Sequence, residues 1–422
     1  MPKRWRLLGW AGIGTIVAVA VVALGARWLL SPTGPRANFP ETVPAAARDC
    51  TSCHNQSTPG IVHDYAMSKH AKRNVTCQSC HQADAKSATT EQHYGYSILA
   101  APTPRTCGSC HAREWAQFDT SRHSARAWYA MTGPGAFNDA DLAKYGLDLK
   151  GKPNSIFTLE GPESTVLGCQ VCHNIGRPNA DGSYGDCSKC HLRHTFSLAQ
   201  VRKPEACAQC HIGPDHPQME IYQESPHGTL YAHEGATWNW DAAPGTLSSK
   251  DQTAPTCATC HMSGFAGAAG THNVGDRLSW YSAPNIATRR EGWQSRRTAM
   301  TTVCLECHTK PFIDKDFKQA DDLIAITNSN VQKGQAIMDG LKKDGFTWAP
   351  FEHPIDFVAF ELWHHEGRRA RFGATMQGPD YVQWHGIYDQ TKDLVEMREL
   401  ERAIRAAPAP AGAGQGGTAH GQ

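Results

Sequence analysis

Cys169-Gln-Val-Cys-His173, Cys187-Ser-Lys-Cys-His191 and Cys207-Ala-Gln-Cys-His211 follow one another closely in the middle of the chain. Two thiols at this spacing form thioethers with the vinyl groups of a haem, and the adjacent imidazole then lies under the iron as its ligand. The same pentapeptide occurs eight times in all. The pattern therefore predicts eight covalently bound haems of the c type.

The eight motifs use all sixteen cysteines of the chain. The predicted haem-binding cysteines are Cys50, Cys53, Cys77, Cys80, Cys107, Cys110, Cys169, Cys172, Cys187, Cys190, Cys207, Cys210, Cys257, Cys260, Cys304 and Cys307. The predicted proximal ligands are His54, His81, His111, His173, His191, His211, His261 and His308. No cysteine remains for a disulfide, and zinc knuckles or redox dithiols need no histidine after the second cysteine.

Charge and composition exclude two other classes of protein. The 422 residues include 41 Lys and Arg against 40 Asp and Glu, so the net charge gives no indication of a nucleic-acid partner. Hydrophobic residues make up 40% of the chain and charged residues 19%, far from the composition of a disordered protein. The body of the chain should therefore fold.

The N-terminus predicts a membrane anchor. A basic stub at residues 1–6 precedes an apolar segment at 7–30, whose uncharged run is about long enough to cross a bilayer. The alternative is a cleaved signal peptide, since Ala23-Leu-Gly25 is an acceptable cleavage site. Because haem is attached outside the bacterial cytoplasm, we expect the body on the periplasmic side of the membrane, anchored, or else soluble in the periplasm after cleavage.

The rest of the chain divides by composition into three regions and a tail. A Pro-rich linker at 31–48 leads to a haem-binding region at 49–312 without sustained strand alternation. Residues 313–405 carry apolar residues at helical spacing, and 406–422 form a low-complexity tail. We expect a mainly α-helical multihaem cytochrome c fold with stacked haems and long C-terminal helices, preceded by one transmembrane helix.

A short repeat indicates distal iron ligands. Ser68-Lys-His70-Ala, Ser121-Arg-His123-Ser and Ser225-Pro-His227-Gly share Ser-x-His before a small residue. Six-coordinate haems need a second imidazole, so these three histidines are predicted to supply it. The alternative is three ordinary surface or core histidines.

The number of histidines leaves the role of the haems open. Of the 22 histidines, fourteen lie outside the motifs, enough to cap every iron. A conduit in which every iron has two imidazoles and an enzyme with one open iron are therefore both compatible with the count.

Several longer segments strongly resemble the hydroxylamine oxidoreductase family of octahaem cytochromes. The segments are Gly168-Cys-Gln-Val-Cys-His173, Asp181-Gly-Ser-Tyr-Gly-Asp-Cys187, His191-Leu-Arg-His194, His211-Ile-Gly-Pro-Asp-His-Pro217, Trp363-His-His-Glu-Gly-Arg-Arg-Ala-Arg371 and Gly378-Pro-Asp-Tyr-Val-Gln-Trp-His-Gly386. The resemblance extends from Asp49 to about Arg402. The Cys-x-x-Cys-Lys motif of multihaem nitrite reductases is absent from the sequence.

The resemblance implies that the fourth haem, held by the motif at 169–173, is catalytic and open on its distal side. Asp215 and His216 are the residues expected above it. A histidine beside a carboxylate can remove protons as electrons leave hydroxylamine. The alternative is that Asp215 caps a turn after Pro214 and that His216 ligates a haem.

The expected direction of the reaction, oxidation rather than reduction, depends on Tyr381. In relatives that oxidise hydroxylamine or hydrazine, a tyrosine in this setting is joined covalently to the catalytic haem of a neighbouring subunit in a trimer. The resemblance therefore implies a fourth haem modified by a Tyr381 cross-link, and a homotrimer. Without the resemblance, Tyr381 would be an ordinary residue of an apolar helix face.

Further distal ligands are predicted from the remaining histidines. They are His194, His272, His385 and one of His364 and His365, with His365 preferred. His63, His93 and His233 stay undecided, and His353 and His420 are expected to have no such role.

We expect an octahaem oxidoreductase that oxidises hydroxylamine, or hydrazine, at the fourth haem. Seven haems with two imidazoles each would carry the electrons to a small cytochrome c or a quinone-linked membrane acceptor. The rivals are a nitrite or hydroxylamine reductase of the same fold and a pure electron-transfer conduit.

Overall fold

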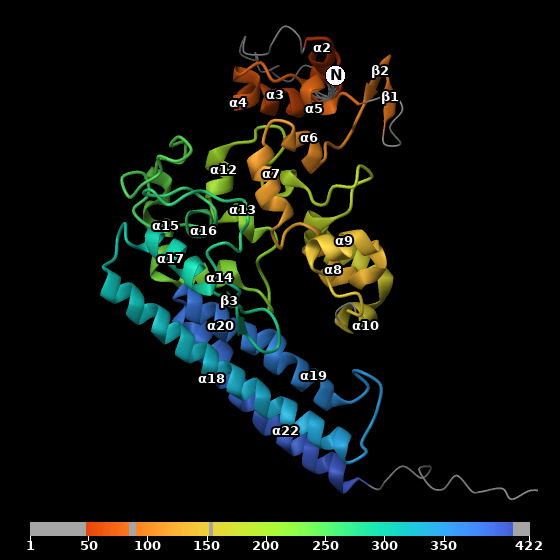
Figure 1. Cartoon of the computed structure of the whole chain (residues 1–422), viewed down its shortest axis with the longest axis vertical. Helices are drawn as coiled ribbons and strands as arrows, with labels where there is room; N and C mark the ends of the chain where they lie inside the picture. The colour runs from red at the N-terminus through yellow and green to blue at the C-terminus, as the bar shows by residue number, and fades with distance from the viewer. Residues whose placement is uncertain (1–47, 84–89, 152–154, 408–422) are drawn as a thin grey trace, which may run out of the picture.

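The computed structural model describes residues 48–83, 90–151 and 155–407. These residues form mostly helices, with two short antiparallel hairpins, so the mainly α-helical prediction is confirmed. Figure 1 shows a body of short helices and loops above a bundle of long helices that extends away from it. The predicted anchor at 7–30, its basic stub, and nearly all of the linker and tail lie outside the described residues.

The N-terminal part of the body consists of short helices and one hairpin. Its elements are α2 (Arg48–Ser57), α3 (Pro59–Met67), α4 (Lys69–Lys72), α5 (Cys77–His81), β1 (Glu91–His93), β2 (Tyr96–Ile98), α6 (Pro104–Gly108), α7 (Ala112–Asp119), α8 (Ala125–Thr132), η2 (Gly133–Ala136) and α9 (Asp139–Tyr145). In the hairpin, Gln92 pairs with Ser97.

The central part of the body is similar. Its elements are α10 (Ser155–Ser164), η3 (Thr165–Cys169), α11 (Gln170–His173), η4 (Asn174–Gly176), η5 (Cys187–Lys189), α12 (Leu198–Arg202), α13 (Glu205–Ala208), α14 (Gln218–Glu224), α15 (Pro226–Glu234), η6 (Gly235–Thr237), α16 (Cys257–His261), β3 (Trp280–Tyr281), β4 (Thr288–Arg289) and α17 (Trp293–Cys304). The second hairpin pairs Trp280 with Arg289.

Three longer helical runs form the C-terminal bundle, as the apolar periodicity predicts. They are α18 (Lys310–Lys343); α19 (Pro354–Glu361), η7 (Leu362–Glu366) and α20 (Gly367–Met376); and α21 (Pro379–Val382), η8 (Gln383–Tyr388) and α22 (Asp389–Ala406). Both η7 and η8 are π-helical turns, a distortion that often accompanies functional sites. Among the described residues, no helix combines the length and apolar character needed to cross a membrane.

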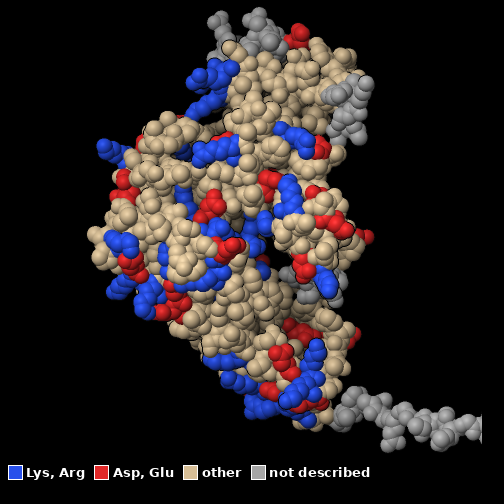
Figure 2. Space-filling model, in the orientation of Figure 1, with Lys and Arg blue, Asp and Glu red and all other residues tan. Residues whose placement is uncertain are grey.

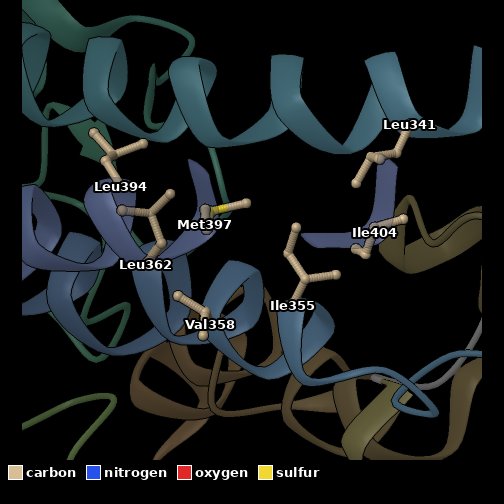
Figure 3. Close-up of a cluster of buried hydrophobic side chains, with 7 residues drawn as sticks. All are labelled: Leu341, Ile355, Val358, Leu362, Leu394, Met397 and Ile404. Carbon is tan, nitrogen blue, oxygen red and sulfur yellow. The ribbon is translucent and has the colours of Figure 1, made fainter. Parts of the chain in front are cut away.

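The bundle has a continuous apolar core, whereas the core of the body is divided. Seven buried side chains from α18, α19, η7 and α22 form one cluster, drawn in Figure 3: Leu341, Ile355, Val358, Leu362, Leu394, Met397 and Ile404. The buried apolar clusters of the body contain two to four residues each. Clusters this small leave little apolar core to stabilise the body, so we expect the body to depend on its haems to fold.

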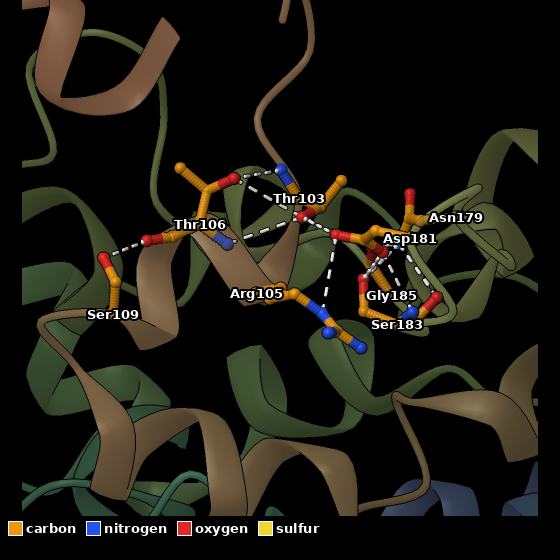
Figure 4. Close-up of polar contacts among 8 residues, drawn as sticks. All are labelled: Thr103, Arg105, Thr106, Ser109, Asn179, Asp181, Ser183 and Gly185. Atoms are coloured by element: carbon orange, nitrogen blue, oxygen red, sulfur yellow. Dashed lines mark hydrogen bonds and ion pairs between the residues drawn. The ribbon is translucent and has the colours of Figure 1, made fainter. Parts of the chain in front are cut away.

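Polar contacts join segments of the body that are far apart in sequence. The Thr103 hydroxyl donates to Asp181 Oδ2 at 2.6 Å, and Arg105 Nε lies 3.9 Å from the same oxygen (Figure 4). Burial raises the pKa of Asp181, but hydrogen bonds from Ser183 and Thr103 outweigh it and lower the pKa. The third motif is thereby held against the loop that precedes the fifth.

Charges of both signs are intermixed over the face of the molecule that Figure 2 shows. This distribution agrees with the near-neutral composition. It gives no indication of a single-sign surface of the kind that nucleic acid would require.

Replacing Ile355 by alanine should lower the free energy of unfolding by about 2–5 kcal/mol, because the side chain is fully buried and its loss leaves a cavity. Denaturant unfolding followed by circular dichroism would measure the change. Ile326→Ala is the control, since Ile326 on α18 is 48% exposed. Equal losses for the two variants would contradict this assignment of the bundle core.

Candidate functional site: paired histidines and an aspartate cluster

Six motif histidines each lie opposite a second histidine. The ring centres are 5.8–6.2 Å apart in the pairs His54 with His93, His70 with His111, His81 with His194, His123 with His211, His191 with His272, and His227 with His308. A metal–imidazole bond is about 2 Å long, so two imidazoles on opposite sides of one iron have ring centres about 6 Å apart. The spacing in all six pairs fits a shared haem iron.

Hydrogen bonds orient several of the motif imidazoles. Nδ1 of His81 lies 2.9 Å from the Leu99 carbonyl, and Nδ1 of His173 lies 2.9 Å from the Ala127 carbonyl. A carbonyl only accepts, so Nδ1 carries the proton and Nε2 keeps its lone pair. A hydrogen bond of this kind fixes the ring so that Nε2 can bind a metal.

The Ser-x-His repeat is a capped turn that presents a histidine. The side chains of Ser68, Ser121 and Ser225 are at most 1% exposed, and each hydroxyl accepts a backbone N–H. The small residue after the histidine has a local reason as well. A Cβ on Gly228 would overlap the carbonyl oxygen of Tyr222, so the turn itself requires glycine there.

The sequence does not decide the role of His93, and the structure pairs it with the first motif. It ends β1, and its ring centre lies 5.8 Å from that of His54 with an interplanar angle of 28°. The only local signal is a Gly95-containing turn after it, which places a histidine at the edge of a hairpin. That signal says nothing about the partner.

The motifs form one connected series in space. Thiols of different motifs are neighbours in the pairs Cys50 with Cys77, Cys80 with Cys107, Cys107 with Cys187, Cys190 with Cys207, Cys172 with Cys210, Cys207 with Cys257, and Cys260 with Cys304. The order is therefore 1, 2, 3, 5, 6, 7, 8, and the fourth motif joins the series at the sixth.

A charged cluster surrounds Asp215. Arg368 Nη1 donates to Asp215 Oδ2 at 3.0 Å, while Arg369 Nε donates to the Pro214 carbonyl at 2.8 Å. His216 Nε2 lies 3.5 Å from Asp215 Oδ1, and His216 Nδ1 is buried without a hydrogen-bond partner. The two arginines of α20 thus fix the loop that carries Asp215 and His216.

The loop returns to the side of His211 that faces away from its iron. Met219 N donates to the His211 carbonyl at 3.0 Å, and Gln218 Oε1 lies 3.2 Å from His211 Nδ1. The His216 ring centre lies 6.1 Å from that of His211, close to the 5.9 Å between His123 and His211. His123 belongs to the Ser-x-His repeat, whereas His216 lies against Asp215, so His123 remains the predicted partner across the sixth haem.

The two histidines of η7 differ in their surroundings. Arg368 Nη1 donates to His364 Nε2 at 3.0 Å, which occupies that lone pair. Burial, and then the charge of Arg368, lower the pKa of His364 to about 2. His365 is half-buried beside Phe360, and burial lowers its pKa too. Of the two, His365 is the freer to bind iron.

His365 and His385 are not placed beside a motif histidine in the described part of the chain. His385 is half-exposed, with Nε2 3.2 Å from Asp380 Oδ2. His173 and His261, in turn, make no ring contact with a second histidine within the residues described. The nearest ring to His173 is that of Phe157, at 5.9 Å.

The fourth motif lies at the surface. A cavity of about 660 Å³ beside Cys169 is lined by residues that include Glu160 and Glu163, and Leu167 is 79% exposed. His173 does not contact Asp215 or His216 directly among the described residues. The fourth motif instead contacts the sixth, where Cys172 Sγ lies 3.9 Å from the carbonyl of Gln209.

Tyr381 lies on α21 against α20, with its ring 5.1 Å from that of His385. Burial, and then Glu224 and Glu220 of α14, raise its pKa. Trp384 and Tyr388, on the adjoining η8, are 58% and 52% exposed. The tyrosine therefore borders an exposed aromatic face.

Comparison with known proteins agrees with the motifs. A family described as "Seven times multi-haem cytochrome CxxCH" matches residues 73–349, which include the second to eighth motifs. A "Probable nitrite reductase-hydroxylamine oxidoreductase fusion protein" of Kuenenia stuttgartiensis is 30% identical over 246 residues. This alignment covers 50% of the present chain and 25% of the fusion, so the chain spans about a quarter of that relative.

Two solved structures share the fold. A "Hypothetical multiheme protein" superposes with a TM-score of 0.75 at 24% identity, covering 89% of this chain and all of that one. The "reducing HAO-like protein complex Kustc0457/Kustc0458" of Kuenenia stuttgartiensis superposes with a TM-score of 0.66 at 21% identity, covering 85% of each chain.

Replacing His93 by alanine should convert one low-spin haem to high spin, because the iron held by His54 would lose its second imidazole. Electron paramagnetic resonance of the oxidised protein would show the change. The exposed His233 provides the control, and His233→Ala should leave the spectrum as it is. An unaltered spectrum in both variants would remove His93 from the set of ligands.

Proposed function

Since the chain belongs to the multihaem cytochrome CxxCH family, and within it to the proteins similar to hydroxylamine oxidoreductase, we propose that it oxidises hydroxylamine at its fourth haem. Eight haems are proposed, one for each motif. The observation that carries the proposal is His216, whose buried Nδ1 has no partner and whose neighbour Asp215 is fixed by Arg368. A buried imidazole left free in this way suits a group that exchanges protons with a ligand.

The chain's own groups divide the work at this site. Haem iron supplies the place where the nitrogen of the substrate binds and the route by which its electrons leave. His216 accepts a proton at a ring nitrogen, and Asp215 stabilises the charge that then forms on the imidazole. Arg368 holds the Asp215 carboxylate in place, so the pair keeps its orientation through repeated proton transfers.

The position of the fourth motif supports the same assignment. His173 and His261 are the two motif histidines with no histidine opposite them in the described structure, so the fourth and seventh irons are the two candidates for an open site. An iron with one protein ligand can bind a substrate on its open side. The adjacency of Cys172 and Cys210 gives the electrons a path to the sixth haem and from there along the series.

The remaining ligands complete the electron path. His70, His93, His123, His194, His227 and His272 are proposed as the second ligands of six haems, on the ring spacings given above. The prediction that His365 and His385 also bind iron has no such spacing behind it, because neither lies beside a motif histidine in the described part of the chain. Electrons would leave to a cytochrome c or a quinone-linked acceptor.

A homotrimer is proposed on two exposed surfaces. Trp384 and Tyr388 flank Tyr381 on one of them, and Leu167 and Val171 lie beside the fourth motif on the other. A second copy that covered both would bring Tyr381 of one subunit toward the fourth haem of its neighbour. The proposed cross-link from Tyr381 to that haem would then favour oxidation.

The second candidate function is the reverse reaction. The curated relative is named a probable nitrite reductase–hydroxylamine oxidoreductase fusion, and one of the two solved structures is named a reducing complex. The same Asp215 and His216 pair would then deliver protons to nitrite or hydroxylamine. The oxidative direction rests on Tyr381, and the pure conduit becomes the third candidate if the fourth iron has two imidazoles.

The cellular setting follows from the covalent haems. The body is proposed to lie on the periplasmic side of the cytoplasmic membrane, held by residues 7–30 or released by their cleavage.

His216→Gln should lower kcat for hydroxylamine oxidation by about 10²- to 10⁴-fold, because glutamine cannot exchange a proton near neutral pH. The absorption spectrum should be unchanged, since His216 is not proposed to bind iron. Steady-state kinetics with an artificial electron acceptor would measure kcat. His233→Gln is the matched control, and equal rates in the two variants would remove His216 from the mechanism.

Tyr381→Phe removes only the phenol oxygen, so the helix should keep its packing and the other haems their spectra. Hydroxylamine oxidation should fall far more than electron exchange among those haems, and subunits should separate on a denaturing gel. Tyr388→Phe provides the control on the same exposed face. If the unmodified protein already runs as a monomer and Tyr381→Phe oxidises hydroxylamine normally, the oxidative assignment is wrong.

A further inference from the structure

Three arginines gather around one tyrosine in the body. The guanidinium of Arg122 lies 4.6 Å from the centre of the Tyr281 ring, and that of Arg290 lies 4.3 Å from it. Burial lowers the pKa of Arg126, and the positive charge of the nearby Arg122 lowers it further. Like charges this close repel one another unless an anion lies between them.

No carboxylate within the described residues forms an ion pair with any of the three. Arg290 is 8% exposed, its Nη1 donates to the Gly275 carbonyl at 2.9 Å, and its Nε is buried without a partner. Burial, and then Arg122, lower the Arg290 pKa to about 10. The charged or titratable groups around the cluster include Tyr281, Tyr145 and Arg296, and Arg122 also shares a cavity with Arg368, whose charge Asp215 balances.

The residue that precedes Arg290, Arg289 at the end of β4, is the opposite case. Arg289 Nη2 lies 2.6 Å from Asp321 Oδ2, and Arg297 donates to both oxygens of the same carboxylate at 2.7 and 2.8 Å. Arg289 and Arg297 therefore have a protein anion, whereas Arg122, Arg126 and Arg290 do not.

The cluster lies between two haem sites. Arg122 directly precedes His123, the partner of His211 at the sixth motif. Gly275, which Arg290 and Arg296 both bind, follows Val274, and Val274 makes a backbone hydrogen bond with His261 of the seventh motif. Carboxylates that reach the cluster can thus come from the sixth or the seventh haem.

We propose that Arg122, Arg126 and Arg290 form the binding site for propionate groups of the sixth and seventh haems and raise the reduction potential of the haem they bind. The inference rests on the proposed assignment of one haem to each motif. The planar guanidinium fork matches a carboxylate with two parallel hydrogen bonds, and Arg290 Nε is a buried donor that such a carboxylate would satisfy. Neutralised propionates no longer stabilise the ferric state, so the haem is reduced more easily.

The position of this haem gives the effect a role in electron flow. Electrons from the fourth haem enter the series at the sixth, beside Cys210. A sixth or seventh haem of raised potential draws electrons away from the site where substrate reacts. The arginines would therefore set the driving force of the first transfer.

The test compares Arg122→Gln with Arg289→Gln in the complete haem-loaded protein. Each variant removes one positive charge. When Arg289 is replaced, Asp321 still forms its ion pair with Arg297. Spectroelectrochemical titration should show one or two haems of Arg122→Gln shifted about tenfold toward the oxidised form, which is about 59 mV for one electron. Resonance Raman spectra should show altered propionate bending bands. Arg289→Gln should show neither change.

Arg290→Gln should shift the reduction potential in the same direction. Arg290 is buried, so this variant can fail to fold, whereas Arg122 is exposed and Arg122→Gln decides the test by itself. Unchanged potentials and Raman bands in Arg122→Gln would overturn the proposal. So would unchanged potentials together with a raised KM for nitrite, which would assign the arginines to a free anion. Shifted potentials in a protein that does not oxidise hydroxylamine would refute the proposed function and leave this inference standing.

Discussion

The distance between two imidazoles on one iron is the constraint on which the structure depends. Six pairs of histidines from distant parts of the chain reach ring separations of 5.8–6.2 Å. The buried apolar clusters of the body contain only two to four residues each, so they contribute little to holding these segments together. Short capped turns, such as those at Ser68 and Ser225, therefore carry much of the positioning. The body is organised around ligand geometry rather than around an apolar core.

The C-terminal bundle, in contrast to the body, is stabilised by an apolar core of its own. Its own core is continuous, and α20 sends Arg368 and Arg369 into the body, where they fix the loop of Asp215. The π-helical turn η7 brings His364 and His365 to the same region. A rigid bundle can hold a charged loop in place without a large local core, which suits the proton-exchanging role proposed for Asp215 and His216.

Unpaired polar groups mark the places where a non-protein group completes the structure. Arg290 has a buried donor without a partner, and His216 has a buried ring nitrogen without one. Buried polar groups without partners are costly, so these two atoms are candidate contacts for the proposed haem propionate and substrate. The two sites differ in their chemistry. Guanidinium groups bind an anion, whereas an imidazole beside a carboxylate can accept and release a proton.

The sequence alone determined the haem motifs, the helical character and the C-terminal helices, because covalent spacing and apolar periodicity are local properties of the chain. It also indicated His70, His123 and His227 from a repeat whose serine cap is local. Which histidine lies opposite which was decided only by the tertiary structure, and so was the pairing of His93 with His54, because two residues that are far apart in sequence can be close in space. The arrangement of Arg122 and Arg290 could not be predicted from the sequence for the same reason. The two residues are far apart in the chain, and only the fold brings both guanidinium groups to the ring of Tyr281 without a carboxylate between them.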